Sequence, residues 1–205
     1  MEKLALITIN EPSVKAAFKA LTYLKPIGEQ YDSHIFHRKG TLANDKNANT
    51  HAYNNVEELL EEIWDDYNVL VFFVATGIVV RKIAPKLKSK TTDPAVLVMS
   101  LDLKKLIPLV SGHIGGANAF SDKLTQLIPE CINFVTTATD QTNTLAFDLF
   151  AKEKGYKILN INYLSILFGF NFANFNISLH TSKKDSKFLS FVLYIGLQID
   201  RTIIF

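Results

Sequence analysis

The chain lacks the features that mark a secreted or membrane-bound protein. Its single cysteine, Cys131, cannot form an intrachain disulfide, which favours a reducing compartment. The first apolar run, residues 4–9, is too short for the hydrophobic region of a signal peptide. The longest apolar region, residues 158–179, is interrupted by five asparagines, which argues against a membrane span. We therefore expect a cytoplasmic protein with no membrane partner.

The chain also has little net charge. Its 22 basic and 20 acidic residues leave a net charge of +2, and the lysines are dispersed, so we expect no nucleic-acid partner. The histidines His34, His37 and His51 lie in or near a polar, asparagine-rich segment without a cysteine beside them, and we expect no metal site. No G-x-S-x-G sequence is present either, so a serine hydrolase is not indicated.

Hydrophobic residues make up 48% of the 205 residues, enough for one substantial core. Segments with the pattern of strands alternate with segments of helical periodicity. The expected strands are residues 4–9, 33–37, 69–75, 95–99, 106–110 and 132–135, and the expected helices are 12–24, 55–65, 78–83, 116–127 and 142–154. Residues 39–50 are expected to form an exposed loop.

This alternation predicts an α/β fold with an open, mostly parallel sheet and helices on both faces, a Rossmann- or flavodoxin-like three-layer sandwich. We expect residues 1–155 to form this domain. Residues 156–205 have no clear period and are expected to form a poorly defined C-terminal extension.

The most informative segment is residues 111–118, Ser-Gly-His-Ile-Gly-Gly-Ala-Asn, between an expected strand and an expected helix. Glycines allow a backbone to approach a ligand closely, and a helix start offers N–H groups to an anion. His113 could in addition transfer a proton near neutral pH. The spacing is neither G-x-G-x-x-G nor that of a P-loop. Such a turn can also serve packing alone, so ligand contact and a structural role both remain open.

Polar residues follow other expected strands as well. Thr76 and Gly77 end the strand at 69–75, and Arg81 lies one helical turn further on, where its guanidinium would suit a carboxylate or a phosphate. Because ligands bind at the carboxyl ends of strands in α/β sheets, we expect these residues and the glycine-rich segment to converge.

Two aspartates at strand ends have two interpretations each. Asp93 precedes a strand, so it would lie at the opposite edge of the sheet unless that strand is antiparallel, and it could simply be a turn aspartate before proline. Asp140 follows Thr137 and Thr139 after the strand at 132–135 and would face the same crevice, but it is equally suited to cap the next helix.

Four segments together resemble one known family. They read ATGI with RKIAP in residues 75–85, KTTDPAV in 90–96, SGHIGGAN in 111–118 and TTATD in 136–140. In order and spacing they resemble cobalamin biosynthesis protein G, the cobalt-precorrin-5A hydrolase family of the oxygen-independent vitamin B12 pathway. The resemblance implies an N-terminal α/β sandwich and an enzyme that opens a δ-lactone on a cobalt-containing macrocycle, releasing acetaldehyde to give cobalt-precorrin-5B. It implies no cofactor, because the cobalt belongs to the substrate.

The resemblance also implies roles for individual residues. His113 would act as general base or acid when water attacks the lactone carbonyl, with Thr76, Thr137 or Asp140 positioning the reactants. Arg81 and the backbone amides of Gly115 and Gly116 would bind the acetate and propionate carboxylates of the substrate. The expected catalytic residues are His113 and Asp140, and the expected substrate-binding residues are Thr76, Gly77, Arg81, Asp93, Ser111, Gly112, Gly115, Gly116, Asn118, Thr137 and Thr139.

Family members usually continue into a separate C-terminal domain, and residues 193–197 resemble its opening strand shortly before Phe205. We therefore expect a truncated or split enzyme whose partners are the cobalt-corrinoid substrate and, in addition, a separately encoded C-terminal domain or other enzymes of the pathway. One alternative is a corrinoid-binding module without catalysis, and another is a non-functional remnant of the enzyme. Turnover, binding without turnover, or neither would distinguish the three.

Overall fold

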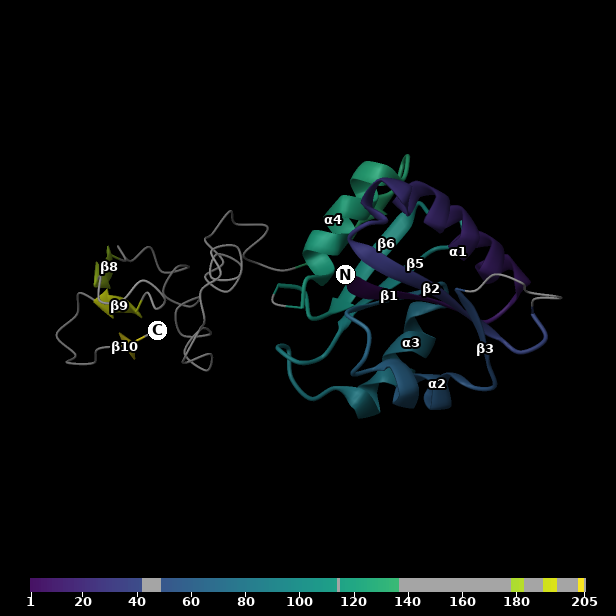
Figure 1. Cartoon of the computed structure of the whole chain (residues 1–205), viewed down its shortest axis with the longest axis horizontal. Coiled ribbons are helices and arrows are strands. Elements are labelled where there is room, and N and C mark those ends of the chain that lie inside the picture. The colour runs from purple at the N-terminus through teal and green to yellow at the C-terminus, as the bar shows by residue number, and fades with distance from the viewer. Residues whose placement is uncertain (42–48, 114, 137–177, 183–189, 195–202, 205) are drawn as a thin grey trace. The chain divides into compact units, whose positions relative to one another are not determined.

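The computed structural model describes residues 1–41, 49–113, 115–136, 178–182, 190–194 and 203–204 (Figure 1). The chain forms two compact units, Met1–Val135 and Thr136–Phe205. The expected helix at 142–154 and the expected domain boundary at residue 155 lie outside the described residues. No helix in the described part of the chain is long and apolar enough to cross a membrane.

The first unit is built on one seven-stranded sheet. Its strands are β1 (Glu2–Thr8), β2 (Tyr31–Arg38), β3 (Thr50–Tyr53), β4 (Val69–Phe72), β5 (Ala95–Met99), β6 (Lys105–Val110) and β7 (Ile132–Asn133). Their order across the sheet is β3-β2-β1-β4-β5-β6-β7. Strands β1 to β5 run parallel, β6 runs antiparallel to β5, and β7 runs parallel to β6. We call the edge at which β1 to β5 begin the amino edge and the opposite one the carboxyl edge.

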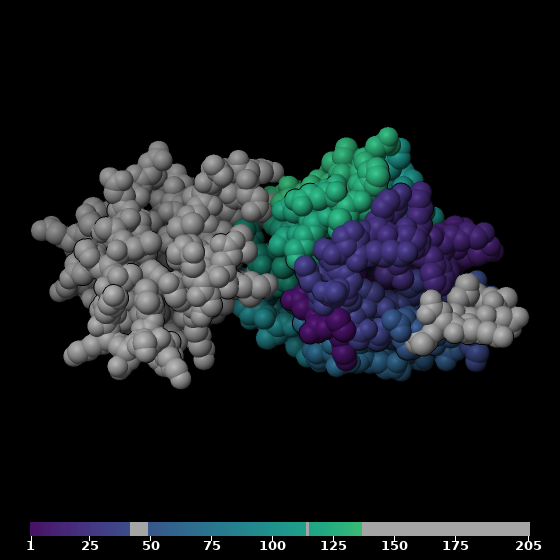
Figure 2. All heavy atoms as spheres, turned by 45° about the horizontal axis from the view of Figure 1, so that its top comes forward, coloured from purple at the N-terminus to yellow at the C-terminus, as the bar shows by residue number. Residues whose placement is uncertain are grey.

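Helices cover both faces of this sheet, as expected (Figure 1). They are α1 (Glu11–Leu24), α2 (Val56–Ile63), α3 (Thr76–Ile83) and α4 (Ala117–Leu127). Helices α1 and α4 pack on one face, and α2 and α3 pack on the other. Figure 2 shows α4, in green, beside the purple and blue of α1 and the segment that follows it. The expected α/β three-layer arrangement is confirmed.

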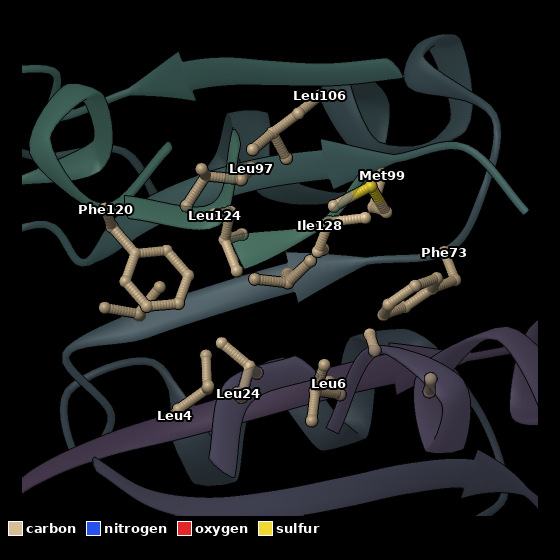
Figure 3. Packing of buried hydrophobic residues seen from close by; sticks show 14 of the residues in the cluster. Leu4, Leu6, Leu24, Phe73, Leu97, Met99, Leu106, Phe120, Leu124 and Ile128 are labelled. Atoms are coloured by element: carbon tan, nitrogen blue, oxygen red, sulfur yellow. The ribbon is translucent and has the colours of Figure 1, made fainter. Parts of the chain in front are cut away.

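The two faces of the central strands are buried in two separate cores. Leu4 and Leu6 of β1 belong to the core under α1 and α4, whereas Ala5 and Ile7 belong to the core under α2 and α3. This alternation explains why the central strands read as continuous apolar runs in the sequence. Figure 3 shows part of the first core, with its labelled residues Leu4, Leu6, Leu24, Phe73, Leu97, Met99, Leu106, Phe120, Leu124 and Ile128.

The structure differs from the expected elements at two places in the first unit. Strand β3 begins at Thr50, where the sequence indicated only a loop, and the buried Tyr53 at its end donates a hydrogen bond from its hydroxyl to the Thr8 carbonyl at 2.7 Å. Helix α3 begins at Thr76, two residues before the expected start, so Thr76 and Gly77 form its first turn instead of ending the strand.

The second unit contains a small antiparallel sheet among the described residues. Strands β8 (Ser178–Ser182), β9 (Ser190–Tyr194) and β10 (Ile203–Ile204) lie in the order β10-β9-β8. Strand β9 overlaps residues 193–197, where the sequence predicts a strand.

Replacing Asn55 should show how much the cap of α2 contributes. The Asn55 side chain accepts a hydrogen bond from the Glu58 backbone N–H at 2.8 Å, as an N-cap does. We expect Asn55→Ala to lower the free energy of unfolding by about 1 kcal/mol in urea titrations. The neighbouring exposed Asn54 does not cap the helix, and Asn54→Ala serves as the control. Equal effects of the two substitutions would contradict this assignment.

Candidate functional site

The reversed direction of β6 places the glycine-rich segment at the amino edge of the sheet. Val110 at the end of β6 pairs with Val96 near the start of β5. The Ser111 hydroxyl then donates a hydrogen bond to the Asp93 carbonyl at 3.0 Å, just before β5 begins. The segment at 111–118 and the loop that leads into β5 are therefore neighbours.

Asp93 organises the loop in front of β5. It is 8% exposed, and one carboxylate oxygen accepts hydrogen bonds from the backbone N–H of Lys88 at 2.9 Å and of Ser89 at 3.0 Å. These contacts are those of a turn aspartate, the second of its two sequence interpretations. We call residues 86–92 the lysine loop, since Lys86, Lys88 and Lys90 alternate along it.

Packing and backbone conformation account for two of the glycines without any ligand. A Cβ on Gly115 would lie 2.3 Å from the Ser111 Cβ and 2.8 Å from the Ser111 carbonyl oxygen. Gly116 has a φ of +87°, which disfavours other residues. Ser111 itself has a φ of +59°, an uncommon conformation for a residue with a side chain. Packing against Ser111 and the positive φ angles therefore constrain the backbone of this turn.

The start of α4 satisfies several of its own amides. The Gly116 N–H donates to the His113 carbonyl at 3.0 Å, the Ala117 N–H to the Ser111 carbonyl at 3.1 Å, and the Asn118 N–H to the Gly112 carbonyl at 3.0 Å. The amide of Gly116 is therefore already engaged within the protein. Of the two amides expected to bind carboxylates, that of Gly115 is the better candidate. His113 is half-buried in this turn.

Thr76 and Gly77 lie at the other edge of the sheet. They follow β4 at the carboxyl edge, whereas the glycine-rich segment follows the reversed strand β6. The expectation that these strand ends converge is therefore wrong, because it assumed that every strand runs in the same direction. A Cβ on Gly77 would meet nothing within 4 Å, so packing does not require a glycine there. Arg81 is exposed in the last turn of α3, which leads back toward the lysine loop.

The described part of the segment after β7 still lies beside the start of β6, where the Phe134 N–H donates to the Leu106 carbonyl at 2.8 Å. Thr136 is exposed. The candidate residues Thr137, Thr139 and Asp140 lie outside the described residues, and their contacts with the glycine-rich segment stay a prediction.

Within the described part of the chain, a further cluster of titratable groups joins β2 to Tyr67, which precedes β4. The His34 ring lies 2.5 Å from the Tyr67 hydroxyl through Nδ1 and 3.2 Å from the Asp32 carboxylate through Nε2. Burial and the Asp32 charge raise the pKa of Tyr67 to about 12. Burial likewise raises the pKa of the Cys131 thiol, so it is a poor nucleophile at neutral pH. The described residues hold no group of three or more His, Cys, Asp or Glu side chains that could bind a metal ion.

Comparison with known proteins identifies the segment that contains the site. Residues 58–140 match the family described as cobalamin synthesis G N-terminal. This segment is thus similar to a cobalamin synthesis G N-terminal domain. The matched segment includes α3, the lysine loop and the glycine-rich segment, so both loops joined by Ser111 and Asp93 belong to it.

Two curated relatives have the same printed name, cobalt-precorrin-5A hydrolase. The protein of Priestia megaterium is 39% identical over 102 residues, covering 50% of this chain and 27% of the relative. The protein of Salmonella typhimurium is 43% identical over 91 residues, covering 42% of this chain and 26% of the relative. The chain thus spans about a quarter of the length of these relatives.

A solved structure supports the fold. The crystal structure of a Sulfolobus solfataricus protein, described as a cobalamin biosynthesis protein G homologue, aligns with a TM-score of 0.52 at 21% identity. The alignment covers 89% of this chain and 51% of that one. At this identity the likeness concerns the fold alone.

The sequence interpretation overlooked the lysine loop. It treated the lysines as dispersed, although Lys86, Lys88 and Lys90 alternate directly before Asp93. Alternating cations ahead of a buried aspartate are a signal that could have identified this loop.

Two glycine substitutions should have opposite effects on stability. Gly115→Ala forces a Cβ against Ser111, and we expect it to lower the free energy of unfolding by about 2–3 kcal/mol. Gly77→Ala adds a Cβ in open space within a helix, and we expect a gain of about 0.5 kcal/mol. Urea titrations of both variants measure the difference. A Gly115→Ala protein as stable as the wild type would contradict the packing described for this turn.

Proposed function

We propose that this chain acts in the hydrolysis of cobalt-precorrin-5A, opening the δ-lactone of the macrocycle and releasing acetaldehyde to give cobalt-precorrin-5B. The observation that carries the proposal is the family match over residues 58–140, which includes both loops of the amino-edge site. The shared name of two relatives at 39% and 43% identity supports the same reaction. We propose that the protein acts in the cytoplasm. We also propose that it needs no cofactor of its own, because the cobalt is part of the substrate.

His113 is the proposed proton-transfer group. Its imidazole would take a proton from water as the water oxygen attacks the lactone carbonyl, and would return that proton to the ring oxygen as the carbon–oxygen bond breaks. The products of this step are a carboxylate and an alcohol. Loss of the alcohol proton and cleavage of the adjacent carbon–carbon bond would then release acetaldehyde, leaving the electron pair on the macrocycle.

The neighbours of His113 fit a supporting role. We propose that the Gly115 amide, in the turn into α4, donates to an oxyanion or a substrate carboxylate. Ser111, Gly112 and Asn118 shape the turn, and we propose that they also contact the substrate. Arg81 is proposed as an additional carboxylate ligand from the end of α3.

A binding module without catalysis is the second candidate. The matches to the two relatives cover about a quarter of each relative's length, so the similarity extends to a part of each hydrolase. In this second case the chain would hold the corrinoid without turnover, and another enzyme of the pathway would carry out the hydrolysis.

An anaerobic assay with cobalt-precorrin-5A separates these possibilities. We expect the purified chain to release acetaldehyde while the corrinoid spectrum changes. His113→Gln should lower kcat about 10²–10⁴-fold, as loss of a general acid–base group does. His34→Gln on β2 is the matched control, because it removes a histidine outside the proposed site, and it should retain activity.

Each other result has a definite meaning. A spectral change without acetaldehyde would favour the binding module. The absence of both the spectral change and acetaldehyde would contradict the proposed function. Full turnover by His113→Gln would remove the role given to this histidine. The Gly77→Ala variant tests the carboxyl edge, where we expect no ligand, and a lost spectral change in that variant would place the substrate there.

A further inference from the structure

We infer that the lysine loop forms a second wall of the amino-edge site and that Lys88 and Lys90 bind carboxylates of the ligand. This inference rests on the proposed function to the extent that the ligand is a polycarboxylated macrocycle. It concerns the specificity of binding and does not depend on whether this chain completes the hydrolysis.

The lysine loop is held in shape by its own hydrogen bonds. The Asp93 carboxylate accepts from the Lys88 and Ser89 amides, and the backbone N–H of Asp93 donates to the Ser89 carbonyl at 2.9 Å. The side-chain oxygens of Ser89 and Thr91 lie 2.8 Å apart. A loop that is ordered in advance loses little conformational entropy when a ligand binds.

A direct hydrogen bond fixes this loop to the glycine-rich segment. The Ser111 hydroxyl donates to the Asp93 carbonyl at 3.0 Å, and both residues are 8% exposed. His113 follows Ser111 by two residues, and Lys90 precedes Asp93 by three. Because this hydrogen bond joins the two loops directly, we infer that a macrocycle bound at His113 also reaches the lysine loop.

The three lysines of the loop differ in how closely an acidic side chain pairs with them. Lys86 forms an ion pair with Glu61 of α2, and its side chain is 19% exposed. Lys88 lies 3.9 Å from Asp65, with both side chains largely exposed, so this pair contributes little. Lys90 is exposed and forms no ion pair within the described residues. Asp93, the one acid of the segment, directs its carboxylate to backbone amides. Lys88 and Lys90 are thus available to anions.

Substituting these lysines leaves the framework of the loop in place. Asp93 binds the main-chain N–H of Lys88, which Lys88→Gln retains. We therefore expect the double variant Lys88→Gln/Lys90→Gln to fold with unchanged stability. Lys15→Gln/Lys105→Gln is the matched control, since it removes the same charge from exposed positions at the carboxyl edge.

Binding can be measured with uroporphyrin I, a fluorescent porphyrin that carries acetate and propionate side chains. In anaerobic titrations of the full chain, we expect Lys88→Gln/Lys90→Gln to raise Kd about tenfold. Lys88→Arg/Lys90→Arg should restore the affinity, and the control pair should bind like the wild type. The log–log slope of affinity against salt should become shallower in the glutamine variant.

Three results would overturn the inference. They are unchanged binding in the Lys88→Gln/Lys90→Gln protein, an equal loss in the carboxyl-edge control, and no uroporphyrin binding by the wild type. The acetaldehyde assay judges the proposed function separately. Uroporphyrin binding that depends on the two lysines, without acetaldehyde release, would support this wall of the site and contradict catalysis by the chain.

Discussion

The antiparallel pairing of β6 with β5 is the constraint on which the site depends. The connection from Ser100 to Lys104 closes a tight turn, in which the Ser100 N–H donates to the Lys105 carbonyl at 2.9 Å and Leu103 has a φ of +63°. Strand β6 therefore returns beside β5 and ends where β5 begins. Ser111, directly after Val110, is consequently at the amino edge, where its hydroxyl contacts the carbonyl of Asp93 directly after the lysine loop.

The contact between Ser111 and Asp93 makes one unit out of two loops. Asp93 uses its carboxylate for the lysine loop and its carbonyl for Ser111, so a single buried residue holds both walls. Gly115 then lies so close to Ser111 that no side chain fits between them. These contacts join the segment that carries a half-buried histidine to a loop that carries exposed cations, an arrangement suited to an anionic ligand that undergoes proton transfer.

The sequence predicts most of the fold but less of the site. Apolar periodicity identified the central strands and the four helices, because burial on both faces leaves a strong pattern. Strand β3 was missed because a short edge strand such as Thr50–Tyr53 buries few side chains. The prediction that Thr76 and His113 lie at the same edge of the sheet was wrong, although the sequence contains a signal for the reversed strand. Only six residues separate the expected strands at 95–99 and 106–110, too few for a parallel crossover. By contrast, the close approach of Gly115 to Ser111 has no sequence signal.

The central claim, that the glycine-rich segment shares an edge with the lysine loop and not with Thr76, can be tested by pulsed electron paramagnetic resonance. Spin labels would be attached at exposed positions, Ala119 with Lys90 in one protein and Ala119 with Ile78 in another, with Cys131 replaced by alanine. The five residues of β5 separate the two edges by roughly 16 Å. The structure predicts that the distance from Ala119 to Lys90 is clearly the shorter one. A shorter distance from Ala119 to Ile78 would contradict the reversed strand and the site built on it.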